Sequence, residues 1–233
     1  MSIDIARLRA NLAGVEERIA AACARAGRRR TDVTLIAVTK TVSAEVAALL
    51  PELGVINLGE NRPQELWRKA AALPASIRWH MIGHLQRNKI ERTLPIPSLI
   101  HAVDSERLLE AIEAEAIKQN RSIDVLLEVN VSGEASKQGF APTALPNLSG
   151  LTRVKVRGLM TMAMLQDAER CRPTFTSLRA LRDRLGLEHL SMGMSNDFEI
   201  AIEEGATFIR LGSVLFEGTA SPSPSGRGVG GEG

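Results

Sequence analysis

Eight short apolar runs, separated by polar segments long enough for helices, constrain the fold of this sequence more than any other feature. The runs span residues 34–40, 55–58, 77–82, 99–103, 124–131, 154–160, 188–191 and 207–211. Apolar runs of this length, rich in β-branched residues, indicate strands buried on both faces of a parallel sheet. Because eight is the number of βα units that closes a barrel, we predict a (β/α)₈ TIM barrel.

An open, doubly wound α/β sheet is the competing fold. The first strand-to-helix turn of that fold usually carries a glycine-rich fingerprint. Here the first run ends in Lys40-Thr41-Val42-Ser43, which contains no glycine. The barrel is therefore favoured.

The regions before and after the repeats define the domain organisation. An apolar stripe at Ile5, Leu8, Leu12, Val15 and Ile19 predicts an extra N-terminal amphipathic helix, with Ser2 as N-cap and Gly27 just past its end. We expect residues 1–218 to form a single barrel domain. Residues 219–233, rich in Ser, Pro and Gly, are expected to be a disordered tail because they have almost nothing to bury.

Composition excludes several classes of function. The net charge of +2 and an aromatic content of 3% argue against nucleic-acid binding. No apolar run approaches the roughly 20 residues of a membrane helix. The isolated cysteines, Cys23 and Cys171, suit a reducing compartment, so we expect a cytoplasmic protein.

A metal held by His80 and His84 is disfavoured, because in an extended chain the two rings are about 13 Å apart.

The active face of a barrel lies at the C-terminal ends of its strands. This rule collects Lys40, Asn57, Asn61, His80, His84, Asn130, residues 132–139, Met160, Thr161, Ser191, Arg210, Gly212 and Ser213. Lys40 has two interpretations. It is either a solvated residue where the strand leaves the core, or an amine whose pKa is lowered by partial burial and which acts as a nucleophile.

The loops after the seventh and eighth runs are typical of phosphate sites in barrels. Residues 191–196 offer hydroxyls, Gly193 and a helix start, while residues 210–213 offer Gly212 and the hydroxyl of Ser213. Each glycine could also be an ordinary turn residue. Together, and facing Lys40, the loops suggest a phosphorylated aldehyde cofactor bound as a Schiff base.

Several motifs resemble those of the pyridoxal-phosphate homeostasis family. They are Thr39-Lys40, Gly59-Glu60-Asn61, the segment 79–89 (Trp-His-Met-Ile-Gly-His-Leu-Gln-Arg-Asn-Lys), the segment 191–195 (Ser-Met-Gly-Met-Ser) and Arg210-Leu211-Gly212-Ser213. The resemblance runs from the first helix to about Gly218. It implies a barrel of the fold-type III pyridoxal-phosphate (PLP) proteins, related to the N-terminal domain of alanine racemase.

The resemblance also implies a set of cofactor-binding residues. Lys40 would hold pyridoxal 5′-phosphate as a Schiff base, and Arg210 would face the pyridine nitrogen. Ser191, Gly212 and Ser213 would hold the phosphate with Met192 nearby, and Asn61 completes the expected set. Family members usually carry an aromatic residue after Gly-Glu-Asn. Here that residue is Arg62, which puts a stacking role in doubt.

Arg210 bears on the chemistry. A guanidinium stays charged and accepts no hydrogen bond, so beside the ring nitrogen it would keep that nitrogen unprotonated and weaken carbanion chemistry. An ordinary ion pair with Glu60, Glu128 or Asp197 is the alternative.

Two functions follow from this interpretation. The first is a carrier or buffer of PLP without efficient catalysis, acting as a monomer with PLP-dependent apo-enzymes as candidate partners. The second is an amino-acid racemase. Racemases resembling this barrel use a tyrosine as second base and a further β domain, whereas this sequence contains no tyrosine and ends soon after its eighth run. The carrier is favoured.

Overall fold

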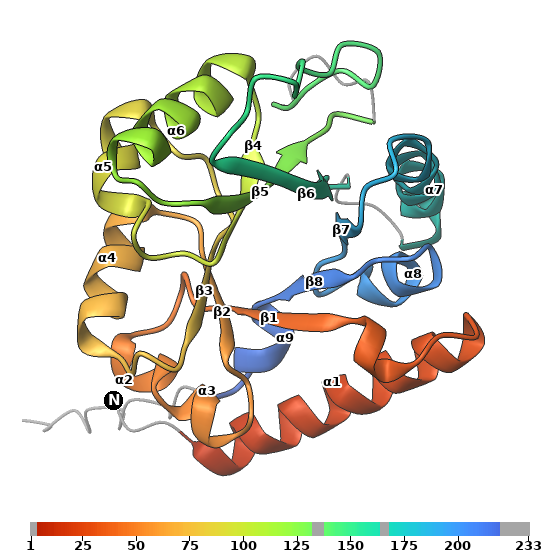
Figure 1. The fold of residues 1–233 in the computed structure, drawn as a ribbon. Coiled ribbons are helices and arrows are strands. Elements are labelled where there is room, and N and C mark those ends of the chain that lie inside the picture. The colour runs from red at the N-terminus through yellow and green to blue at the C-terminus, as the bar shows by residue number, and fades with distance from the viewer. Residues whose placement is uncertain (1–3, 132–137, 164–167, 220–233) are drawn as a thin grey trace, which may run out of the picture.

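The structure, a computed structural model, describes residues 4–131, 138–163 and 168–219. Eight parallel strands close into a barrel in chain order, and β8 pairs back with β1 (Figure 1). The strands are β1 (Thr34–Val38), β2 (Asn57–Glu60), β3 (Arg78–Met81), β4 (Leu99–Val103), β5 (Ile123–Glu128), β6 (Val154–Met160), β7 (His189–Ser191) and β8 (Phe208–Leu211). The predicted barrel is confirmed.

Helices surround the strands on the outside of the barrel (Figure 1). They are α1 (Ile5–Arg25), α2 (Ala44–Ala47), α3 (Leu49–Glu52), α4 (Pro63–Ala72), α5 (Ile90–Thr93), α6 (Glu106–Lys118), α7 (Ala168–Arg184), α8 (Phe198–Glu203) and α9 (Ser213–Phe216), with 3₁₀ turns η1 (Arg30–Asp32) and η2 (Arg87–Lys89). The predicted N-terminal helix α1 lies alongside β1 and packs against α8 and α9.

Some boundaries differ from the sequence prediction. The N-cap of α1 is Asp4, whose carboxylate accepts from the Arg7 N–H, whereas Ser2 lies outside the described residues. Helix α7 begins at Ala168 and includes Pro173. The short helix α9 was not predicted, and the tail from residue 220 lies outside the described residues.

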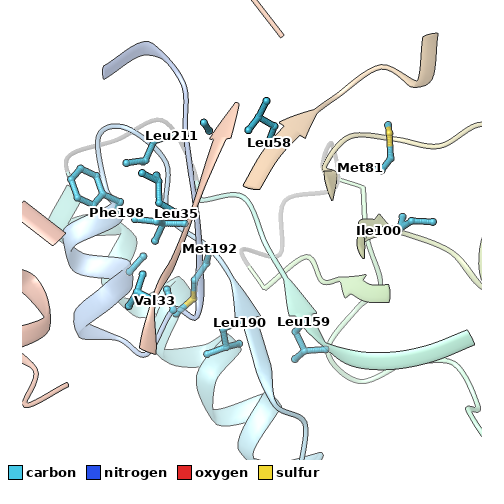
Figure 2. Close-up of a cluster of buried hydrophobic side chains, with 14 of the residues drawn as sticks. Val33, Leu35, Leu58, Met81, Ile100, Leu159, Leu190, Met192, Phe198 and Leu211 are labelled. Atoms are coloured by element: carbon cyan, nitrogen blue, oxygen red, sulfur yellow. The ribbon is translucent and has the colours of Figure 1, made fainter. Parts of the chain in front are cut away.

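The core has two layers because side chains alternate across each strand. One set faces the helices and forms the main hydrophobic core, as Figure 2 shows for Leu35, Leu58, Met81, Ile100 and Leu190. A smaller apolar cluster of Leu99, Ala102, Leu126 and Met160, with Phe208 against it, is separate from that core. These residues alternate with the helix-facing set, so they belong to the barrel interior.

The same alternation turns polar residues into the barrel. His80 lies between the helix-facing Trp79 and Met81, and Arg210 lies between Ile209 and Leu211. Both polar side chains are almost wholly buried. The interior is therefore partly polar. None of the helices in the described ranges is long and apolar enough to cross a membrane.

Candidate functional site

A cavity of about 640 Å³ opens at the C-terminal ends of the strands. Its walls include Lys40, Asn61, Glu128, Arg210, Gly212 and Ser213. They come from the ends of four strands, β1, β2, β5 and β8, so the barrel brings together residues that are far apart in the sequence. The size falls within the range of small-molecule sites, roughly 300–1,000 Å³.

Lys40 lies in the turn that follows β1. Thr39 is fully buried and its N–H donates to the Gly59 carbonyl at 3.0 Å, which extends the pairing of β1 with β2 by one residue. The Val42 N–H then donates to the Thr39 carbonyl at 3.1 Å, closing the turn, and Lys40 is exposed to the cavity. A primary amine therefore stands at the mouth of the barrel.

Two loops form a further part of the wall. Ser195 and Asn196, after β7, line the cavity together with Gly212 and Ser213, after β8. The loops meet where the Val214 N–H approaches the Ser195 hydroxyl oxygen at 3.5 Å. Gly193 holds a left-handed conformation, φ +93°, and a Cβ there would lie 2.6 Å from the Ala201 methyl, so glycine is required for this close approach. This part of the wall thus carries the hydroxyls of Ser195 and Ser213 close to the backbone of Gly212.

Arg210 forms part of the cavity floor. It is buried, and its Nη1 donates to Ser191 Oγ at 2.6 Å while its Nη2 donates to the Thr161 carbonyl at 3.0 Å. In the described part of the chain no carboxylate lies within ion-pair distance of it, so the salt-bridge alternative with Glu60, Glu128 or Asp197 is not what holds the guanidinium. Burial lowers the pKa of Arg210 to about 10, and the negative charges of Asp197 and Glu128 oppose that shift.

Two carboxyl groups line the cavity near Arg210. Burial raises the pKa of Glu128, with a further rise from Asp104 that the positive charge of Arg210 opposes. Burial also raises the pKa of Asp197, although the Met194 N–H donates to its Oδ1 at 2.6 Å and favours the charged form. The cavity wall therefore carries carboxyl groups as well as the cationic groups of Lys40 and Arg210. The carboxyl groups were not predicted from the sequence.

A chain of hydrogen bonds runs through the barrel interior from Arg210. Ser191 Oγ lies 2.8 Å from His101 Nδ1, His101 Nε2 lies 3.0 Å from His80 Nδ1, and His80 Nε2 lies 3.2 Å from Asn57 Oδ1. A guanidinium can only donate and an amide oxygen can only accept. Every bond of the chain must therefore point from Arg210 toward Asn57, which assigns the proton of each imidazole to Nε2.

The two histidines of this chain are neutral. Burial lowers the pKa of His80 to about 4 and moves the pKa of His101 well below its ordinary value. Neutral rings with one proton each match the direction of the hydrogen bonds. The series of hydrogen bonds therefore holds the Arg210 side chain through neutral groups.

Five of the seven predicted cofactor-binding residues line the cavity: Lys40, Asn61, Arg210, Gly212 and Ser213. Ser191 and Met192 do not. Ser191 is wholly buried and hydrogen-bonded to Arg210, and Met192 is buried in the hydrophobic core, in the same cluster as Val33 and Phe198 (Figure 2). The alternation at the strand end turns Ser191 inward and Met192 toward the helices, and their contact with a phosphate stays a prediction.

Asn61 and Arg62 form the side of the cavity near β2 and β3. Asn61 rests against Gly83, where a Cβ would lie 2.4 Å from the Asn61 carbonyl oxygen, so the glycine allows this contact. Arg62, in place of the family's aromatic residue, is exposed and lines the wall. The exposed ring of His84 also lines the wall, and its Nδ1 lies at hydrogen-bond distance, 2.8 Å, from Asp104 Oδ2.

Glu128 and Asp197 were not predicted as parts of the site. The position of Glu128, as the last residue of β5 and two residues from the inward-facing Leu126, was a usable signal. Residues 132–137 of the predicted loop after β5 lie outside the described residues. Among the described residues, no group of three or more His, Cys, Asp and Glu side chains is placed to hold a metal ion.

Comparison with known proteins agrees with this geometry. Residues 3–220 match the sequence family described as alanine racemase, N-terminal domain. A pyridoxal phosphate homeostasis protein of Aquifex aeolicus is 46% identical over 217 residues, covering 88% of this chain and 95% of the relative. The PLP-bound structure of PipY from Synechococcus elongatus is 35% identical with a TM-score of 0.75, covering 87% of this chain and 99% of that chain.

A more distant likeness concerns the fold alone. Alanine racemase of Clostridium difficile is 16% identical with a TM-score of 0.73, and the match covers 96% of this chain but 59% of that one. The barrel described here therefore corresponds to one part of that longer protein.

Proposed function

Because the chain belongs to the pyridoxal phosphate homeostasis family, we propose that it binds pyridoxal 5′-phosphate through a Schiff base to Lys40 and carries or buffers that cofactor. The single observation that carries the proposal is the shared cavity. The exposed amine of Lys40, the buried guanidinium of Arg210 and the hydroxyl of Ser213 open onto one space of about 640 Å³. These are the groups that an aldehyde, a pyridine nitrogen and a phosphate require.

The donor set fits the phosphate of the cofactor. The hydroxyls of Ser213 and Ser195 and the backbone at Gly212 are the groups that would hold it. Ser213 and Ser195 lie on the two loops that meet at Val214. Hydrogen bonds to a charged phosphate are roughly twice as strong as those between neutral groups, so a few donors suffice.

Arg210 would hold the ring nitrogen. Its Nη1 and Nη2 each donate a hydrogen bond to one acceptor, and the neutral hydrogen-bonded groups behind the guanidinium fix its orientation. The cofactor supplies an aldehyde that condenses with a primary amine and, when its ring is protonated, a sink for electrons. A permanently charged donor at the ring nitrogen keeps that nitrogen unprotonated. Arg210 would therefore weaken the cofactor as an electron sink and leave its aldehyde free to condense with an amine.

We propose that the protein catalyses no efficient reaction of its own. The sequence contains no tyrosine that could serve as a second base, and Arg210 takes the place that a carboxylate occupies in strong electron sinks. Both features suit carriage of the cofactor. PLP-dependent apo-enzymes are the proposed receivers, and a monomer is the proposed working form.

Borohydride trapping tests the proposal. Incubation with pyridoxal 5′-phosphate followed by reduction should leave a stable adduct that peptide mass mapping assigns to Lys40. Lys40→Ala should lose the adduct and keep its fold, since the side chain is exposed. Lys89→Ala, at a lysine in the neighbouring surface pocket, is the matched control and should behave like the unaltered protein. An adduct on Lys89 or Lys137 in place of Lys40 would refute the assignment.

A further inference from the structure

A buried ion pair lies behind the turn that carries Lys40. Lys69 on α4 and Glu60 at the end of β2 are both fully buried. Lys69 Nζ donates to Glu60 Oε1 at 2.5 Å and to the Thr39 carbonyl oxygen at 2.6 Å. The Thr39 hydroxyl donates to the same carboxylate oxygen at 2.6 Å. Three residues thus form one closed network.

The network reaches Lys40 through the backbone. The Thr39 carbonyl belongs to the peptide group that joins Thr39 to Lys40, and it also accepts the Val42 N–H that closes the turn. The Lys69 ammonium therefore holds the plane of the peptide from which the Lys40 side chain departs. Neither Lys69 nor Glu60 lines the cavity, so their effect on a ligand passes through neighbours: Thr39, which both contact, and Asn61, which follows Glu60 in the chain.

Stability alone does not account for this pair. Taking both charges out of water is costly, and apolar residues of similar volume often replace a buried ion pair without loss. Glu60 Oε2 is buried and has no hydrogen-bond partner among the residues that the structure describes, which adds to that cost. The same layer between strands and helices is otherwise filled by residues such as Leu58, Met81 and Ile100 (Figure 2).

We infer that Lys69 and Glu60 are positioning residues that hold the turn 39–42 so that the amine of Lys40 faces the cavity. This inference rests on the proposed function and adds two residues to it. A ligand that must reach Lys40, Arg210 and Ser213 together depends on the direction of the amine. A small aldehyde that needs only the amine does not.

The experiment compares two charge-neutral replacements with the unaltered protein. In Lys69→Met/Glu60→Gln no charge is buried, and the glutamine oxygen still accepts from the Thr39 hydroxyl. Thr39→Val/Glu60→Leu/Lys69→Met is a wholly apolar version. Glu113→Gln is the matched control, because that buried carboxylate accepts the backbone N–H of Val154 at 2.7 Å, where β6 begins at the opposite end of the barrel.

Two of the measurements are the urea midpoint of unfolding and the affinity for pyridoxal 5′-phosphate. The third is the methylation ratio, defined as the rate at which formaldehyde and cyanoborohydride methylate Lys40 in the apo-protein, divided by the rate for the exposed Lys155. In binding, the Lys40 nitrogen adds to the aldehyde carbon and one water leaves. In methylation, the same loss of water is followed by hydride transfer from cyanoborohydride.

The neutral replacements should keep the urea midpoint and the methylation ratio, while the affinity for pyridoxal 5′-phosphate falls about 10–100-fold, a loss of about 1.4–2.8 kcal/mol. Glu113→Gln should lower the midpoint and keep the affinity. Folded neutral variants with unaltered affinity would overturn the inference, and so would failure of both to fold, since the pair would then serve the fold. Absence of an adduct on Lys40 in the unaltered protein would instead refute the proposed function.

Discussion

Arg210 Nη1 lies 2.6 Å from Ser191 Oγ, and this distance decides what the serine can do. The hydroxyl oxygen accepts from the guanidinium and its proton is given to His101 Nδ1. Ser191 is therefore committed inside the barrel, behind the cavity and not on its wall. The cavity wall carries other hydroxyls for a phosphate, among them those of Ser195 and Ser213 on the loops after β7 and β8.

Ser191→Ala and Ser213→Ala should therefore differ in their effects on ligands. Loss of the Ser213 hydroxyl should weaken pyridoxal 5′-phosphate by about 1.5–3 kcal/mol, the worth of a hydrogen bond to a charged group, and should spare unphosphorylated pyridoxal. Loss of the Ser191 hydroxyl leaves a buried Arg210 donor unpaired, so both ligands should weaken by the same factor. Titration of each variant with each ligand is the measurement. Selective loss of the phosphorylated ligand in Ser191→Ala would contradict this assignment.

Gly212→Ala should weaken the phosphorylated ligand more than Ser213→Ala does. An added Cβ would lie 3.3 Å from the Val38 carbonyl oxygen and 3.4 Å from Val38 Cβ, so the loop must move away from β1. Such a shift displaces the backbone and the Ser213 hydroxyl together. Gly150→Ala, where an added Cβ meets nothing within 4 Å, is the control and should bind normally. Equal affinities of the two alanine variants would show that the loop tolerates the methyl group.

Acid should destabilise the protein through His80. Burial lowers its pKa to about 4, against 6.5 in the unfolded chain. Between these values the unfolded chain binds a proton that the native chain does not, so the free energy of unfolding falls as the pH drops from 6.5 toward 4. The loss is about 3 kcal/mol, and the stabilisation is fully present above pH 6.5. Urea unfolding from pH 4 to pH 8 measures it.

Two variants identify the residue responsible for this pH dependence. His80→Gln keeps an acceptor for the His101 N–H and removes the titrating ring, so the slope between pH 6.5 and pH 4 should flatten. His84→Gln, at an exposed ring, should retain it. A slope that His80→Gln leaves unchanged would assign the effect to other groups, His101 foremost, since its pKa shifts in the same direction.

The loaded protein should turn over amino acids poorly. The sequence lacks a tyrosine for the second proton transfer, and general acid–base catalysis typically contributes 10²–10⁴-fold. Incubation with L- and D-amino acids in deuterated water, followed by NMR of the Cα position and chiral chromatography, measures exchange and racemisation. Racemisation faster than about 1 s⁻¹ would make the protein a racemase. It would point to Glu128 or His84 as the second base.

The sequence by itself determined the architecture and the position of the cavity. Eight apolar runs in βα order can bury both faces only in a parallel sheet, and closure places the loop after each strand at one end. That rule was enough to bring Lys40, Asn61, Arg210, Gly212 and Ser213 to one cavity. Their roles toward the cofactor stay predictions until the trapping and titration experiments are done.

Only the tertiary structure decided which face of each strand looks inward. In a strand buried on both sides, apolar residues at alternate positions look alike in sequence, so the separation of Ser191 from Met192 could not be predicted. The path from Arg210 to Asn57 depends on the register of five strands, of which β7 and β8 are distant in sequence from β2, β3 and β4. Lys69 meets Thr39 for a similar reason: a helix must first pack on the barrel before its buried face acquires a partner.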